Sequence, residues 1–197
     1  MCWNAEVSLQ SFGIGIAAVL LMWLKGSPPA RIFCLLSISI MQFIEFIVWT
    51  FYNNSAINTA AAMAASALLA IQPLASLSLI PSAQATLRNT LISIYVTLQS
   101  ILFTQTEHNL SKYHMRKGAN GHLQWLWLER KPISFVVYAV YFTFLFLPLI
   151  IIKDWLLLSA GLVTLLFSFY SFWKTNTWGS MWCWIVILTA SAAVLLG

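Results

Sequence analysis

The sequence predicts an all-α protein, a polytopic transmembrane bundle of seven helices. Of its 197 residues, 60% are hydrophobic and only 8% are charged, whereas an ordinary soluble domain has about 25% charged residues. The mean hydropathy is +0.83. Because a soluble domain of this size could not bury so much apolar surface, we expect an integral, multi-pass protein whose main partner is the lipid bilayer.

Seven apolar segments follow one another along the chain. A spanning helix needs about 20 apolar residues, so seven of them fill most of the sequence and leave no room for a soluble domain. We therefore expect a single transmembrane helical domain over residues 1–197. The expected helices cover residues 9–24, 32–52, 59–80, 87–103, 134–152, 155–173 and 180–196.

The first three segments end at residues that break helices. The first stops at KGSPP, the second at Asn53-Asn54-Ser55 and the third at Pro81. The third begins with the small-residue run AAAMAASA, which permits close approach of neighbouring helices. It also contains Gln72-Pro73. The proline frees a backbone carbonyl one turn earlier, which predicts a kink that neighbours must satisfy, with Gln72 as a ready partner.

The fourth segment, 87–103, is the most polar, so it is either a helix buried among the others or an interfacial one. It is followed by the longest loop, about residues 104–132, which holds all three histidines and five bases. Within this loop, GANGHLQWLWL alternates around Asn120-Gly121. That pattern is typical of a short hairpin or of an interfacial aromatic patch.

The last three segments are separated by short connections. Pro148 lies near the end of segment 134–152, and Lys153-Asp154 forms a very short turn before the next helix. The final helix opens with WGSMWCW, and three indoles in seven residues are typical of an aromatic belt at the membrane surface.

The distribution of bases leaves two topologies open. With seven spans, six bases on one side against four on the other favour a cytoplasmic N-terminus. If segment 87–103 does not span, almost every base lies on one side and the N-terminus lies outside. The sequons Asn53-Asn54-Ser55 and Asn109-Leu110-Ser111 would share a side in the seven-span topology.

Glu45 is the most informative residue, because it is the only charge that we place inside a span. A carboxylate at that depth costs a few kcal/mol unless it is protonated or faces polar partners. Polar side chains recur on its helix at spacings of three and four, and so lie on one face. They are Ser39, Gln42, Glu45, Trp49 and Tyr52.

We predict that this face lines a polar pocket inside the membrane, shared with the kink at Gln72. The expected ligand-binding residues are Glu45, Gln42, Trp49, Gln72 and Tyr52. The ligand would be a small molecule, a lipid, an ion or a proton. The alternative is that these side chains only form hydrogen bonds between helices and fix their packing.

Other kinds of site are not predicted. The histidines, His108, His114 and His122, lack the spacing of zinc ligands, and the three cysteines are too scattered for a metal site or a disulfide framework. No phosphate-binding or dinucleotide-binding loop occurs, so no metal, cofactor or catalytic residue is expected. The bases form no stripe with interleaved aromatics, so no nucleic acid is expected.

Four stretches of the chain carry a resemblance to a family. MCWNAEVSL, MQFIEFIVW, NGHLQWLW and GSMWCWI together resemble an uncharacterised family of small multi-span membrane proteins associated with giant DNA viruses and protists. The resemblance spans most of the chain. It implies no activity, but it implies that Gln42, Glu45, Trp49 and the terminal Trp-Cys-Trp belong to a shared pattern.

Three functions follow from these expectations. The first is binding or transport of a ligand in the pocket around Glu45. The second is a structural role, in which the bundle packs into a larger membrane assembly or a homo-oligomer and Glu45 only clamps helices. The third is an intramembrane enzyme, and it ranks last because the sequence shows no combination of nucleophile, base and metal.

Overall fold

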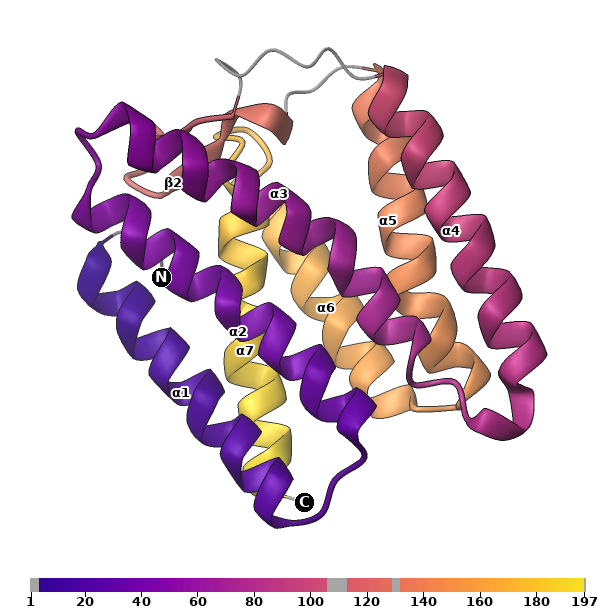
Figure 1. The fold of residues 1–197 in the computed structure, drawn as a ribbon. Helices are drawn as coiled ribbons and strands as arrows, with labels where there is room; N and C mark the ends of the chain where they lie inside the picture. Colours follow the sequence, from indigo (N-terminus) through magenta and orange to yellow (C-terminus); the bar gives the residue numbers. More distant parts are fainter. Residues whose placement is uncertain (1–3, 106–112, 129–131, 197) are drawn as a thin grey trace.

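The computed structural model describes residues 4–105, 113–128 and 132–196, and these residues form an all-α bundle. Its helices run up and down between two ends, with the N-terminus at one end and the C-terminus at the other (Figure 1). The seven α-helices are α1 Ala5–Leu24, α2 Pro29–Thr50, α3 Ser55–Leu77, α4 Ala85–Gln105, α5 Pro132–Ile151, α6 Trp155–Phe172 and α7 Trp178–Leu196. Each expected segment is thus confirmed as a helix, with ends that differ by a few residues.

Local signals explain where the helices begin. Asn4, Asn54 and Asp154 each cap the helix that follows, because their side-chain oxygens accept a hydrogen bond from a backbone amide in the first turn. α2 begins at Pro29, where a proline needs no hydrogen-bond acceptor for its nitrogen. These caps extend α1, α2 and α3 a few residues ahead of the apolar segments that predicted them.

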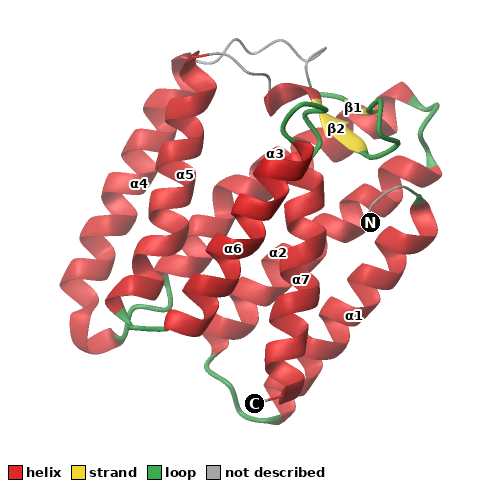
Figure 2. Cartoon of the chain, turned by 180° about the vertical axis from the view of Figure 1, so that it is seen from behind, coloured by secondary structure: helices red, strands yellow, loops and turns green. Residues whose placement is uncertain are grey.

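A short β-hairpin covers one end of the bundle. Strands β1 (Met115–Lys117) and β2 (Leu123–Trp125) pair antiparallel, and Gly121 takes a positive φ of 83° in the turn. Two short 3₁₀-helices, η1 (Ser82–Gln84) and η3 (Leu126–Leu128), complete the described structure. Of the two interpretations of the Asn120-Gly121 pattern, the structure has the hairpin (Figure 2).

The helices form one continuous arrangement with α1 and α4 at its edges. α1 packs against α2 and α7, α2 against α3, α3 against α5, and α6 against α7. α4 packs against α5 and, over fewer residues, against α3. It runs the full height of the bundle beside α5 (Figure 1), so all seven helices run between the same two ends.

Within the described residues, five helices are long and apolar enough to cross a membrane, judged by length and composition. They are α1, α2, α3, α6 and the Ser134–Ile151 portion of α5. α7 contributes a shorter apolar stretch, Trp178–Ala192, and α4 is less apolar, as the sequence indicated. The fold is therefore a helical bundle with the composition of a membrane protein.

Candidate functional site

The polar face of α2 is turned into the bundle. Ser39, Gln42 and Glu45 are each 0% exposed. The Gln42 side-chain amide Nε2 donates a hydrogen bond to Glu45 Oε2 over 3.4 Å. Cys183 of α7 lies within electrostatic reach of this carboxyl group. The acid is therefore placed between α2 and α7, away from the outer surface of the bundle.

Trp49 lies at the end of α2 and Tyr52 in the turn that follows it, beside the hairpin. Their rings stack with centroids 6.0 Å apart. The Tyr52 hydroxyl accepts a hydrogen bond of 2.9 Å from the backbone nitrogen of Lys117 in β1. Asn58 of α3 binds the same strand twice, since it exchanges hydrogen bonds with the Met115 backbone nitrogen and carbonyl at 2.8 and 2.9 Å. This end of the polar face therefore holds the hairpin on the helices.

Gln72 joins three helices. It is 3% exposed, its Nε2 donates to the Ser37 carbonyl of α2 over 3.3 Å, and its Oε1 accepts from the Tyr141 hydroxyl of α5. In the same turn of α3, the Tyr95 hydroxyl of α4 donates to the Ala70 carbonyl over 2.8 Å, next to the Leu69 carbonyl that Pro73 leaves without its helical donor. The side chain expected to satisfy the kink thus bridges helices instead.

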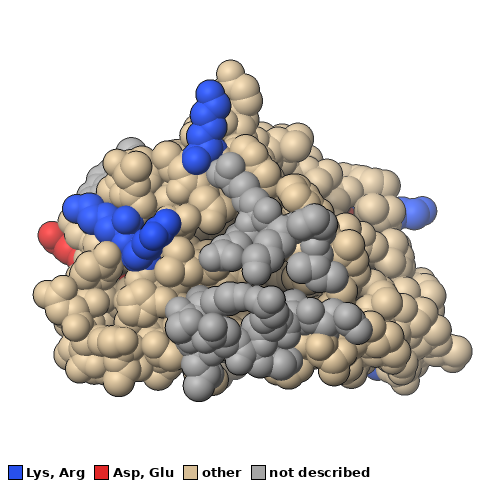
Figure 3. Space-filling model, turned by 90° about the horizontal axis from the view of Figure 1, so that it is seen from above, with Lys and Arg blue, Asp and Glu red and all other residues tan. Residues whose placement is uncertain are grey.

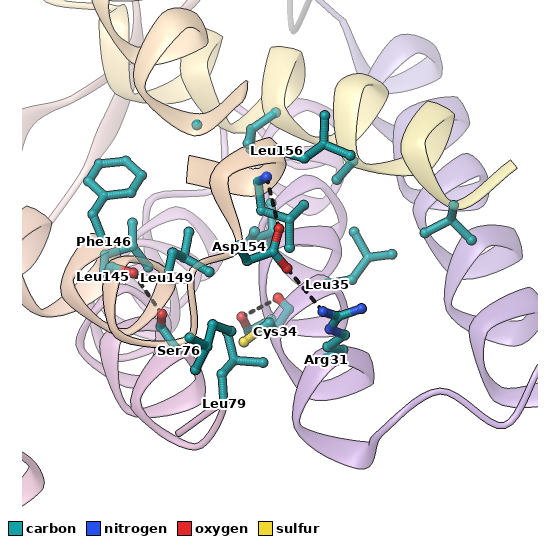
Figure 4. A pocket seen from close by; sticks show the side chains of 18 of the residues that line it. Arg31, Cys34, Leu35, Ser76, Leu79, Leu145, Phe146, Leu149, Asp154 and Leu156 are labelled. Atoms are coloured by element: carbon teal, nitrogen blue, oxygen red, sulfur yellow. Dashed lines mark hydrogen bonds and ion pairs between the residues drawn. The ribbon is translucent and has the colours of Figure 1, made fainter. Parts of the chain in front are cut away.

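A large cavity lies at the other end of the bundle. It has a volume of about 840 Å³ and lies between the ends of α1, α3 and α5, the starts of α2 and α6, and one side of α7 (Figure 4). Apolar side chains dominate its walls, among them Leu35, Leu149, Phe146, Trp182 and Val186. Gln72, Ser37 and Ser76 add a polar patch deeper inside.

Charged side chains line the mouth of this cavity. Arg31 Nη2 forms an ion pair of 3.0 Å with Asp154 Oδ2, which joins the start of α2 to the α5–α6 turn (Figure 4). Lys25 Nζ donates to the Val194 carbonyl of α7 over 3.1 Å. Lys153 also lines the mouth, in the α5–α6 turn. With three bases and one acid, the mouth carries a net positive charge.

The structure separates the five residues that we expected to bind one ligand. Gln72 lines the large cavity, whereas Gln42, Glu45, Trp49 and Tyr52 are not among its described lining residues. Gln42 and Glu45 lie together in the packed interior, and Trp49 and Tyr52 border a shallow surface hollow at the α2–α3 turn. The structure therefore does not bring all five residues together in a single pocket.

Sequence reasoning missed the mouth of the cavity. In the sequence, Arg31 and Lys153 are bases at helix ends, which indicate the orientation of a protein in the membrane. Lys153-Asp154 is typical of a turn. No pattern linked them, because they come from separate loops that meet only in the folded chain. The adjacent opposite charges of Lys153 and Asp154 are visible in the sequence. Arg31, which forms the ion pair with Asp154, lies 123 positions away.

Two of the three indoles of WGSMWCW lie inside the bundle rather than at its surface. Trp178 and Trp182 are 4% and 5% exposed and pack into an aromatic cluster with α5 and α6, where Trp178 and Phe169 stack with centroids 4.3 Å apart. The expectation of surface anchors is wrong for these two residues. Tertiary packing places them inside because aromatic and aliphatic side chains of α5 and α6 surround them.

The histidines and cysteines that the structure describes form no group that could hold a metal ion. No cluster of three His, Cys, Asp or Glu side chains occurs in residues 4–105, 113–128 and 132–196, and Cys34 and Cys183 are free. His108 and Cys2 lie outside the described residues. His122 is buried against Phe172, with ring centroids 5.7 Å apart, and this burial lowers the pKa of its imidazole below the ordinary 6.5.

Comparison with known proteins adds no relative. No family model, no curated protein and no solved structure matches this chain. The function must therefore be argued from the geometry of the chain itself.

Proposed function

We propose that this multi-pass membrane protein binds an amphiphilic small molecule or lipid in the cavity between α2, α3, α5, α6 and α7. The observation that carries the proposal is the cavity itself, about 840 Å³ in volume with apolar walls and a charged mouth. Its volume falls within the range of about 300–1,000 Å³ that small-molecule sites have.

The walls support an apolar chain as the buried part of the ligand. Leu35, Leu149 and Val186 are nearly fully buried in the protein yet face the cavity. Filling this space with an alkyl chain removes apolar surface from water at about 25 cal/mol per Å². The inner polar patch offers a ligand few free hydrogen-bonding groups, because the side chains of Gln72 and Ser76 already form hydrogen bonds to other helices.

A cavity-filling substitution tests the proposal. Cys34 lines the cavity, so Cys34→Trp places a large ring in the space for the ligand. We expect native mass spectrometry of the full chain, purified in mild detergent, to show co-purified amphiphile on the wild type. We expect at least tenfold less on Cys34→Trp, as for a loss of about 1.4 kcal/mol or more in binding.

The neighbouring residue provides a matched control. Phe33 is 44% exposed and does not line the cavity, so Phe33→Trp should retain the amphiphile. If Cys34→Trp does not fold, Leu157→Trp on α6 with Val163→Trp as its control repeats the test from the opposite wall. Equal retention by cavity and control variants would contradict the proposal.

A structural role is the second candidate, and the packing of Asn58 and Gln72 favours it. Each forms a buried hydrogen bond to another segment of the chain. A bundle that serves only as a scaffold would contain these clamps and no cavity ligand. The same mass spectrometry separates the two functions, because a scaffold gives no amphiphile that depends on the cavity.

A further inference from the structure

We infer that the head group of the bound amphiphile is an anion, a phosphate or a carboxylate, held at the cavity mouth by Arg31 and Lys153. This inference rests on the proposed function and specifies the class of its ligand. The observation behind it is that three bases and one acid line the mouth, whereas the walls beyond it are mainly apolar. A ligand with an anionic head and an apolar tail matches both parts.

Arg31 has the donors that such a head group requires. A guanidinium carries five N–H donors in a fork that matches carboxylate and phosphate oxygens. Among the described residues, only one acceptor side chain contacts it, Asp154 through Nη2. The side chain is 48% exposed at the mouth, so its other nitrogens are accessible to a ligand without loss of the ion pair.

Asp154 is a fixed counter-charge rather than a competitor. Its Oδ1 accepts a hydrogen bond of 3.2 Å from the Leu157 backbone nitrogen and caps α6. With one oxygen on the cap and the other on Arg31, the carboxylate orients the guanidinium and neutralises one of the three bases. The mouth keeps an excess of about two positive charges for the ligand.

Lys153 is placed at the mouth by a tight turn. Its backbone has a positive φ of 57°, and the turn is closed by hydrogen bonds from the Lys153 and Asp154 nitrogens to Ile150 and Leu149. In the described part of the chain, no acceptor holds the Lys153 ammonium group. The turn therefore adds a second base to the cavity lining, next in sequence to the Asp154 that pairs with Arg31.

Lipids that share one acyl chain and differ in their heads test the inference. We expect lysophosphatidic acid to bind the purified full chain with a Kd about 25-fold below that of lysophosphatidylcholine. The reason is that each base near a membrane surface contributes roughly a fivefold preference for an anion. Arg31→Gln combined with Lys153→Gln should reduce this preference to about twofold or less. Kd values come from native mass spectrometry titrations.

Two further variants make the test specific. Arg88 belongs to the same end of the bundle but not to the described cavity lining, so Arg88→Gln should keep the full preference. Asp154→Asn retains a capping side chain but removes the counter-charge, so it should strengthen the preference. A loss of preference in Arg88→Gln equal to that of the double variant would overturn the inference, because it would assign the effect to the charge of the whole face.

The outcomes separate this inference from the proposed function. Equal binding of lysophosphatidic acid, lysophosphatidylcholine and an uncharged monoacylglycerol by the wild type would overturn the anionic head group and leave the cavity function standing. No binding of any of them would refute the function itself. Inorganic phosphate that binds as tightly as lysophosphatidic acid, and equally well to Cys34→Trp, would show a site for a free anion and overturn the inference.

Discussion

Individual polar side chains in this bundle form hydrogen bonds to one another or to neighbouring segments rather than pointing into one pocket. Gln72 bridges α2, α3 and α5, Asn58 holds β1, and Gln42 donates to Glu45 on its own helix. In a low-dielectric interior, such contacts avoid the cost of an unsatisfied polar group. For residue pairs such as Gln42 and Glu45, the first effect of a substitution is therefore on stability.

Glu45 gives the first prediction at this scale. Glu45→Ala removes the acceptor of the Gln42 amide inside the bundle, and we expect a loss of about 1–3 kcal/mol in the free energy of unfolding. Glu45→Gln keeps the size and a hydrogen-bonding oxygen and should cost less than half of that. Unfolding in mixed micelles measures both, and equal losses would show that the charge rather than the hydrogen bond matters.

His122 gives a prediction about pH. Burial lowers the pKa of this imidazole below 6.5, so folding favours its neutral form. The stability that this contributes is complete above pH 6.5 and is lost as the pH falls toward the lower pKa of the folded state. At about pH 5 we expect the hairpin amides of residues 115–125 to exchange with deuterium faster, relative to the helices, than at about pH 7.5.

A non-titrating side chain tests that assignment. His122→Gln should abolish most of the extra pH-dependent exchange in the hairpin, beyond the intrinsic effect of pH on exchange chemistry. His114, which is half-buried in the same loop, supplies the comparison variant His114→Gln, and this one should keep the effect. If both variants behave like the wild type, another group controls the hairpin.

At the scale of elements, the contact between α1 and α2 depends on one small residue. Gly15 of α1 faces Ser39 of α2 so closely that a Cβ atom would meet the serine side chain. Small residues at such crossings permit close packing where no hydrophobic effect drives helices together. Gly13 lies two residues earlier, on another face of the same helix, and has open space at its Cβ position.

The two glycines predict opposite effects of the same change. Gly13→Ala should leave stability unchanged or raise it by up to about 1 kcal/mol, because alanine favours the helix. Gly15→Ala should lower stability by about 1–3 kcal/mol through overpacking against α2. Thermal unfolding of the two variants beside the wild type measures the difference, and equal midpoints would disprove the close contact.

The element that sequence reasoning left open is α4. Its inner face, centred on Tyr95, packs on α3 and α5, whereas hydroxyl side chains such as Thr90, Ser93 and Thr97 remain exposed. These exposed polar side chains explain why α4 is less apolar than the neighbouring helices. Its antiparallel course beside α5 (Figure 2) supports the seven-helix topology.

At the scale of the whole molecule, the cavity and the hairpin lie at opposite ends. α2 packs against α1, α3 and α7, and α6 packs against α5 and α7, which leaves the cavity between the starts of α2 and α6. At the hairpin end, aromatic and aliphatic side chains pack around Trp125 and Met115, and a smaller cavity of about 180 Å³ lies beside Trp125. The exposed bases Arg116, Lys117 and Lys174 belong to this end, and Figure 3 shows where bases gather on it.

The topology predicts where added cysteines can be labelled. Ser82 in the α3–α4 connection and Ala119 in the hairpin turn are both exposed and lie at opposite ends of the bundle. In oriented vesicles, and in a background with the native cysteines replaced by serine, a membrane-impermeant maleimide should label Ser82→Cys and Ala119→Cys from opposite sides. Labelling of both from one side would mean that α4 does not cross the membrane.

The sequence by itself determined the fold class and the seven helices, and it indicated the hairpin as one of two interpretations of the Asn120-Gly121 pattern. Hydrophobic segment length, helix breakers such as Gly26 and Pro81, and the Asn120-Gly121 turn are local properties, and local properties are sufficient to set elements in a chain whose polar backbone must be satisfied within each segment. The periodicity of α2 also correctly placed Gln42 and Glu45 on a face that is buried.

Tertiary structure alone decided where the cavity lies. The cavity is lined by residues of α2, α5, α6 and α7 that are far apart in the sequence, and its mouth combines Arg31 with Lys153 and Asp154, which are more than 120 positions away from it. Likewise, burial of Trp178 and Trp182 depends on the helices that surround α7. Side-chain pattern predicts which face of a helix turns inward, but only the packing of several helices determines whether the space it faces is filled or empty.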